Sequence, residues 1–274
     1  MALYVNTNIS SLNAQRNLTT SGSALATSLQ RLSSGLRVNS AKDDAAGLAI
    51  ASGMDSQVRG SNQAIRNAND GISLAQTAEG ALSQIQENTQ RMRELTVQAS
   101  NSTVSTTNLT QIKKEMDALG AENKRLVSST KFNGKTLFGS AAKSFNFQVG
   151  ANSSADNQIK VTIAALAFSQ AAATAASMST NSAARALLSK FDNDLKTLAN
   201  ARADLGATQN RFSAVVSNLQ NYVENISASK SRIVDADFAS ETATMTRNQI
   251  IQQAGTAMLS QANQLPQTAL SLLK

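Results

Sequence analysis

The chain has 274 residues, enough for one or two domains, and it contains neither cysteine nor histidine. The first absence rules out disulfides and thiolate metal sites, and the second removes the commonest general base and zinc ligand. The formal net charge is +7, but the 25 Lys and Arg residues are scattered, so we expect no nucleic-acid interface. Aromatic residues make up only 4% of the chain, which favours thin helical bundles over a thick sandwich or barrel.

The first predicted helix covers about residues 6–36. Its leucines follow a heptad pattern, in which hydrophobic residues repeat in two rows: Leu18, Leu25, Leu29 and Leu32. Ser40 and Asp43 have the spacing of a capping box, which predicts that a second helix begins at about Asp43. Residues 34–43 are therefore interpreted as a linker.

Two more helices are predicted at about residues 44–100 and 105–130. The apolar stripe of the first drifts into a late row of Ala78, Ile85, Met92 and Ala99. Apolar residues of the second recur at helical spacing and include Leu109, Ile112, Met116, Leu119 and Leu126.

Residues 130–165 change to a pattern of strands. Asn133-Gly134 is the favoured pair for a tight hairpin turn. Apolar and polar residues alternate over residues 145–149 and 159–163, which predicts two strands joined across Gly150–Ser153. Residues 166–183 then form a predicted exposed connection.

The longest periodic stretch is the heptad pattern from Ala184 to Ile226. One row contains Ala184, Phe191, Leu198, Leu205, Phe212, Leu219 and Ile226, and Leu188 and Leu195 belong to the other. Arg202 and Gln209 interrupt the second row, where polar residues reduce stability but can fix register. We expect them to mark the place where the bundle opens towards a neighbouring subunit. A polar break is predicted over residues 227–237.

A last helix is predicted to begin near Asp237. Four of its apolar residues are strictly seven apart: Ile251, Met258, Leu265 and Leu272. Pro266 lies inside this helix and predicts a kink there.

No candidate catalytic, cofactor or metal site withstands scrutiny, so the chain is not expected to be an enzyme. Asp43/Asp44 and Asp235/Asp237 are paired carboxylates, but both pairs precede helices, where acidic residues favour the N-terminal end of the helix dipole. Lys135 follows the hairpin turn and only resembles a phosphate-binding loop, because Ser129 stands where the first glycine is required.

No membrane insertion is expected either. The most apolar run, Val161–Phe168, is far shorter than the ~20 residues that span a bilayer. The first residues have no basic start followed by an apolar stretch, so export is expected by a route without a cleaved signal.

Several long motifs resemble those of the bacterial flagellin family, in the order in which that family has them. They are Leu32–Gly47, Arg66–Ser73, Gln90–Gln98, Phe132–Gly134, Gln148–Asn152, Asp235–Phe238, Asn263–Gln267 and Leu270–Lys274. The resemblance covers both ends of the chain and nearly everything between them. Variable outer domains would be replaced here by residues 166–183 alone, so the chain resembles a short-form flagellin.

This resemblance implies a mainly α fold, an elongated helical bundle or coiled-coil rod with a small β-hairpin region and the termini paired at one end. Residues 1–43 and 230–274 would be terminal helices that form an inner-tube coiled coil. Residues 44–165 and 184–229 would be the rod domain.

The implied function is that of a structural subunit that polymerises into the bacterial flagellar filament and serves motility, outside the cell after type III export. Self-assembly would use eight residues of the terminal helices: Leu18, Leu25, Leu29, Leu32, Ile251, Met258, Leu265 and Leu272. The implied partners are further copies of the chain, an export chaperone, a filament cap and hook–filament junction proteins.

The resemblance also implies binding to the Toll-like flagellin receptor of hosts. The residues that match the family's receptor-binding positions are Arg91, Leu95, Gln98 and Glu115. The same face would also pack subunit against subunit. Two alternatives remain: a hook–filament junction protein, which would lack much of the 66–98 motifs, and a chemoreceptor-like coiled coil, which would need no hairpin.

Overall fold

A computed structural model describes residues 7–165 and 180–271, with residues 265–271 described by their backbone alone. The predicted connection at 166–183 thus lies almost entirely outside the described residues. The chain divides into two compact units, one of residues 1–58 with 224–274 and one of residues 59–223. The boundary between the units falls within the two longest helices.

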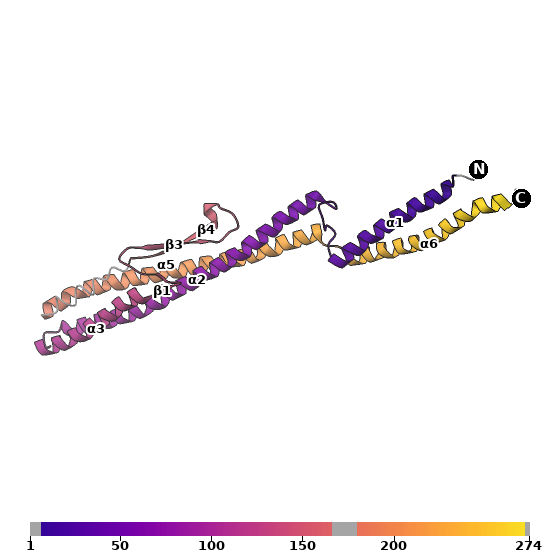
Figure 1. Ribbon diagram of the computed structural model, residues 1–274. Coiled ribbons are helices and arrows are strands. Elements are labelled where there is room, and N and C mark those ends of the chain that lie inside the picture. Colours follow the sequence, from indigo (N-terminus) through magenta and orange to yellow (C-terminus); the bar gives the residue numbers. More distant parts are fainter. Residues whose placement is uncertain (1–6, 166–179, 272–274) are drawn as a thin grey trace. The chain divides into compact units, whose positions relative to one another are not determined.

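The first unit contains the two terminal helices, α1 (Ile9–Ser34) and α6 (Phe238–Ser271), which lie side by side (Figure 1). Asn8 caps the start of α1, and Gly35 ends it with a φ of 71°, a conformation that favours glycine. Asp237 caps α6 by accepting a hydrogen bond from the Ala239 amide at 2.9 Å.

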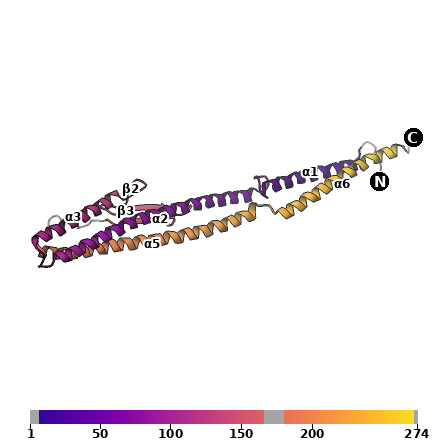
Figure 2. The same cartoon turned by 90° about the horizontal axis from the view of Figure 1, so that it is seen from below.

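The helices α2 (Ala45–Ala99) and α5 (Asn181–Val234) run antiparallel in the second unit, and α3 (Thr106–Ser129) packs beside α2 (Figure 2). A side-chain hydroxyl caps the start of α3 and of α5. The Ser105 and Thr180 side-chain oxygens accept hydrogen bonds from backbone amides in the first turn of each helix. The predicted helices at 44–100 and 105–130 are therefore confirmed.

Two small antiparallel hairpins follow α3. The first pairs β1 (Lys131–Phe132) with β2 (Lys135–Thr136), and its turn residues Asn133 and Gly134 have φ values of 47° and 77°. These positive values are what the Asn-Gly pair predicts.

The second hairpin pairs β3 (Lys143–Gln148) with β4 (Gln158–Ile163), and Phe145 lies opposite Val161. The strands are joined by a longer loop than predicted, because a 3-10 turn, η1 (Ala155–Asn157), follows Gly150–Ser153.

The hairpin covers a core formed between α2 and α5. The Phe212 ring is fully buried and meets the Phe147 ring edge-on, with centroids 5.5 Å apart and planes at 86°. Gly71 makes room for it, since a Cβ at that position would lie 2.6 Å from the Phe212 Cζ atom. Glycine is needed here for close approach.

The predicted heptad row of α5 is only partly buried. Its first five members lie in the core: Ala184, Phe191, Leu198, Leu205 and Phe212. Leu219 and Ile226 are half-buried. Leu188 and Leu195 of the predicted second row are only half-buried, whereas the nearby Leu187 and Ala201 are buried.

Two predicted boundaries are wrong. Residues 227–234 are the last turns of α5 rather than a polar break, because tertiary contacts hold them: Lys230 Nζ lies 2.6 Å from Asp55 Oδ1, and Val234 is buried. Ser40 does not cap α2, which begins at Ala45 with Asp44 as its cap. The proline at 266 does not end α6.

Candidate self-association surface

The buried residues of the contact between α1 and α6 are small or polar. Those buried in the first unit's helix pair are Ser11, Ser21, Ser28, Asn248 and Ala262. The helices approach closely at Gly255, where a Cβ would lie 3.3 Å from Leu18 Cδ1. A seam of this composition removes little apolar surface from water, so the pair gains little hydrophobic stabilisation.

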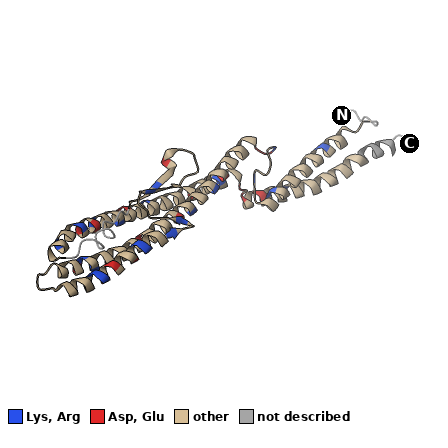
Figure 3. Cartoon of the chain, turned by 60° about the vertical axis from the view of Figure 1, so that its left-hand side comes forward, with Lys and Arg blue, Asp and Glu red and all other residues tan. Residues whose placement is uncertain are grey.

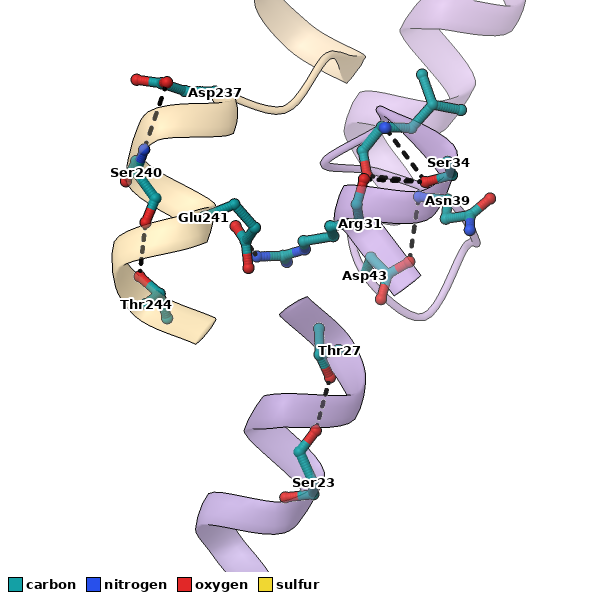
Figure 4. A network of polar contacts seen from close by, with 11 residues as sticks. Ser23, Thr27, Arg31, Ser34, Asn39, Asp43, Asp237, Ser240, Glu241 and Thr244 are labelled. Atoms are coloured by element: carbon teal, nitrogen blue, oxygen red, sulfur yellow. Dashed lines mark hydrogen bonds and ion pairs between the residues drawn. The ribbon is translucent and has the colours of Figure 1, made fainter. Parts of the chain in front are cut away.

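Polar contacts hold the two ends of this pair. Near the start of α1, the Asn8 side chain donates to the Ala262 carbonyl at 2.7 Å and the Ser11 hydroxyl donates to Asn263 Oδ1 at 2.8 Å. Near its end, Arg31 lies 3.8 Å from Glu241 (Figure 4). These partly buried contacts position the two helices relative to each other.

Several large apolar side chains of the terminal helices remain exposed. Those exposed are Ile9, Leu12, Leu29, Phe238, Ile250, Ile251 and Met258. On α6 they border a shallow apolar groove lined by Phe238, Ala239, Thr242, Ala243, Thr246, Arg247, Ile250 and Ile251. A contiguous uncovered patch of this kind is typical of an association surface.

The residues predicted for self-assembly fall into three groups. Leu29, Ile251 and Met258 are exposed, at 48%, 44% and 62%, so one copy of the chain leaves them uncovered. Leu18, Leu25 and Leu32 are half-buried in the seam. Of the remaining two, Leu265 is described by its backbone alone and Leu272 lies outside the described residues.

The heptad pattern of α6 did not identify the face of that helix that contacts α1. The seam uses Asn248, Gly255 and Ala262, which are also seven apart, whereas the row of Ile251 and Met258 lies on another face. The spacing of the small and polar row was visible in the sequence, but hydrophobicity alone points to the wrong face. The groove residues Phe238 and Ile250 were missed as well.

The segment after α1 is fastened to the junction of α5 and α6. The amides of Arg37 and Val38 both donate to the Val234 carbonyl, at 2.6 and 3.3 Å, and the Ala236 amide donates to the Gly35 carbonyl at 2.9 Å. The Arg37 side chain also donates to the Ile233 carbonyl at 2.5 Å. These bonds satisfy carbonyls that the end of a helix leaves without partners.

One carboxylate of each predicted acidic pair, Asp44 and Asp237, lies at the start of a helix. Asp44 accepts a hydrogen bond from the Gly47 amide at 2.8 Å, and Asp237 caps α6. Asp43 closes the preceding turn by accepting from the Ser40 amide and hydroxyl, at 2.9 and 3.0 Å. Among the described residues, no cluster of acidic side chains has the arrangement of a metal site.

The turn at Asp43 predicts a pH effect. Hydrogen bonds from the Ser40 amide, and then from its hydroxyl, lower the pKa of Asp43 below its ordinary value of 3.8. Since the folded pKa is the lower one, the turn is stabilised above the unfolded value and loses that stabilisation as pH falls through the folded value. Carbon NMR of the carboxyl should give a midpoint below 3.8. Ser40→Ala should raise it, and an unchanged midpoint would contradict this role of the hydroxyl.

The predicted receptor-binding residues come together on α2 and α3 only in part. Arg91 Nε lies 3.0 Å from Glu115 Oε1 on α3, and a second Arg91 nitrogen lies 3.3 Å from Glu94. The hydrogen bonds to Glu115 and Glu94 raise the pKa of Arg91 above its ordinary value. Gln98 is also exposed, but Leu95 is only 2% exposed and packs inside the helical core.

Charged residues of both signs occur along the long helices and are sparse on the terminal ones (Figure 3). In the part of the chain that the structure describes, no helix has the length and apolar character needed to cross a membrane.

The fold and the uncovered terminal helices define a class: helical structural proteins with exposed association faces. Sequence profiles of the bacterial flagellin N-terminal and C-terminal helical regions match residues 5–143 and 188–273. The chain belongs to the bacterial flagellin family, whose members are structural proteins, and is a subunit of the flagellar filament.

Relatives match the chain over its whole length. A flagellin of Halalkalibacterium halodurans is 41% identical over 272 residues, covering 99% of this chain and 100% of the relative. One of Xenorhabdus nematophila is 44% identical, covering 100% of both chains. The alignment with flagellin D of Vibrio cholerae runs over 376 positions against the 274 residues here, so this is a short form.

Among solved structures, the crystal structure of Bacillus cereus flagellin is similar with a TM-score of 0.48 at 27% identity. The match covers 56% of this chain and 88% of that chain.

Proposed function

We propose that the chain assembles through its terminal helices, which bury their uncovered apolar faces only when several copies pack together. The supporting observation is the exposure of Ile250, Ile251 and Met258, at 61%, 44% and 62%, on the helix that α1 contacts by another face. Association that removes these side chains from water would gain about 25 cal/mol for each Å² of apolar surface. On α1, Leu29 is exposed in the same way, and Leu18, Leu25 and Leu32 are half-buried and would become more fully buried on assembly.

The terminal helices of a free subunit are weakly held, and neighbours order them. A two-helix contact with serine, asparagine and glycine in its seam is marginal in water. Packing of further copies adds the missing apolar contacts. In this proposal, residues 1–43 and 230–274 form the inner tube of the filament. Residues 44–165 and 184–229 form the rod domain that surrounds the tube.

The same surface explains the need for partners before assembly. An exposed apolar α6 associates non-specifically unless it is covered, so an export chaperone binds there until a filament cap and the preceding subunits replace it. The absence of cysteine means that no disulfide obstructs export of the unfolded chain. The subunit is thereby secreted and meets junction proteins only at the base of the filament.

Removal of residues 238–274 tests the proposal. Purified full-length chain should elongate when filament seeds are added, as followed by light scattering and electron microscopy. The deletion variant should not elongate, because it lacks α6 and its apolar groove. Its circular dichroism should still show the helices of residues 59–223 melting cooperatively. Elongation at the normal rate without α6 would refute assembly through the terminal helices.

The exposed Arg91–Glu115 pair supports a second activity, recognition of the free subunit by a Toll-like receptor. Arg91, Gln98 and Glu115 would make the contacts, and the buried Leu95 would act by holding α2 in place. A junction protein is the weaker alternative, because the match to the flagellin N-terminal region spans residues 5–143, which include the 66–98 motifs.

Arg91→Ala should weaken receptor binding by at least about tenfold if Arg91 is a central contact, since such arginines carry about 2 kcal/mol or more. Surface plasmon resonance with the receptor ectodomain measures this. Arg125→Ala is the matched control, because Arg125 also forms an exposed ion pair, with Glu122 at 2.6 Å. Equal effects of the two substitutions would indicate a general charge effect.

A further inference from the structure

The apolar pattern between α2 and α5 does not by itself define one alignment of the two helices. One buried row of α2 repeats strictly at sevens: Ala64, Gly71, Ala78, Ile85, Met92 and Ala99. The buried row of α5 from Ala184 to Phe212 has the same period. If α5 slides along α2 by seven residues, the two rows face each other again. Their spacing alone therefore allows more than one register.

Polar contacts in the seam break this repetition. The Arg202 guanidinium lies between Gln86 and Glu79, donating to Gln86 Oε1 at 2.9 Å and lying 3.7 Å from Glu79 Oε1. One heptad further on, the Gln209 side chain donates to the other Glu79 oxygen at 2.8 Å. We call these four residues, Glu79, Gln86, Arg202 and Gln209, the α2–α5 polar cluster.

The cluster therefore joins elements of one subunit. This corrects the expectation that Arg202 and Gln209 mark an opening towards a neighbour. Both are half-buried, and their partners on α2 are seven residues apart, as they are themselves.

A slip in either direction brings like charges together. Moving α5 by one heptad one way would place Arg202 between Gln86 and Arg93, away from Glu79. Moving it the other way would place Arg202 between Glu79 and Ile72, which keeps that ion pair but loses the Gln86 contact, and would bring Arg93 opposite Arg185. In the observed register Arg93 instead lies 2.6 Å from Asp192. Like charges that face each other are destabilising.

A steric element adds to the electrostatic one. Phe212 adds a steric preference for the observed register, because a slip would place its ring against Ala64 or Ala78 instead of Gly71. Each alanine carries a Cβ, which at position 71 would overlap the ring.

We propose that the α2–α5 polar cluster selects the register of α5 on α2, and that its contribution is to specificity rather than to stability. Partly exposed ion pairs add little stability, whereas a polar residue at a seam position can fix register. Glu79, Gln86, Arg202 and Gln209 are thus positioning residues that align the outer surfaces of the second unit. The inference concerns the free subunit and stands whether or not the terminal helices drive assembly.

Cysteine pairs can measure the register, because the chain has no cysteine of its own. Arg93→Cys with Asp192→Cys reports the observed register to a short bismaleimide cross-linker. Arg93→Cys with Ala199→Cys or with Arg185→Cys reports slips of one heptad in the two directions. With the cluster intact, only the 93–192 pair should cross-link efficiently.

Replacing the cluster by Glu79→Leu, Gln86→Leu, Arg202→Met and Gln209→Leu should leave the melting temperature unchanged or raise it. Cross-linking at one or both slipped pairs should then increase at least about tenfold. Cross-linking confined to the 93–192 pair in this variant would overturn the proposal, since packing alone would then select the register.

If the fourfold variant does not fold, exchanging the charges of Glu79 and Arg202 tests the same proposal. Glu79→Arg alone places two arginines together and should reduce the 93–192 cross-link. Glu79→Arg with Arg202→Glu restores an opposite pair and should restore that cross-link. Failure of the exchange to restore it would contradict a specific role of this pair.

Discussion

Phe212→Ala is expected to lower the free energy of unfolding of residues 59–223 by about 3–5 kcal/mol, the usual cost of removing a fully buried aromatic ring. The ring is completely buried, contacts Phe147 edge-on and fills the space over Gly71. The cavity cannot collapse easily, because two long helices and a hairpin form its walls. Urea denaturation followed by circular dichroism measures the change.

Phe238→Ala is the matched control for this prediction. Phe238 is 58% exposed on α6, so its removal should change the free energy of unfolding by no more than about 0.5 kcal/mol. A double-mutant cycle adds a sharper test, because Gly71→Ala should destabilise the parent but be tolerated once Phe212 is alanine. A loss below about 1 kcal/mol for Phe212→Ala would mean that this core is not as the structure describes it.

Ile251→Asp together with Met258→Asp is expected to raise the critical concentration for filament growth by more than about a hundredfold, equivalent to about 3 kcal/mol. Each carboxylate would enter an apolar contact between copies, where an unpaired charge is costly. The free subunit should be unaffected, because both side chains are exposed in it.

Seeded growth measured by sedimentation tests this second prediction, with circular dichroism as the check on folding. Gln253→Asp introduces the same charge at an exposed polar position of α6 and should allow growth. If the double variant elongates as the parent does, Ile251 and Met258 are not part of the contact between copies.

Much of the candidate site was predictable from heptad spacing. Leu18, Leu25 and Leu32 are seven apart and lie together in the first unit. The face that α6 turns towards α1 was not predictable, because two rows of α6 share the same period and the less hydrophobic one forms the seam. Leu95 illustrates a similar limit, since its spacing from Arg91 suggested a shared surface, yet it lies in the core.

The two helix boundaries that were predicted wrongly have a related cause. Residues 227–234 are polar enough to suggest a break, and the Lys230–Asp55 contact with a residue far away in the chain keeps them helical. Likewise, the capping spacing of Ser40 and Asp43 is real, but it closes a turn, and the neighbouring Asp44 caps the helix.

The sequence by itself determined the helices, the Asn-Gly hairpin and the family, because these depend on local periodicity, turn geometry and long contiguous motifs. Only the tertiary structure decided which of several rows with the same period faces a partner within the subunit. It also decided that Arg202 and Gln209 bind Glu79 and Gln86 rather than marking an opening. A seven-residue repeat identifies a face of a helix but not the partner or register of that face, which depend on contacts between residues far apart in the chain.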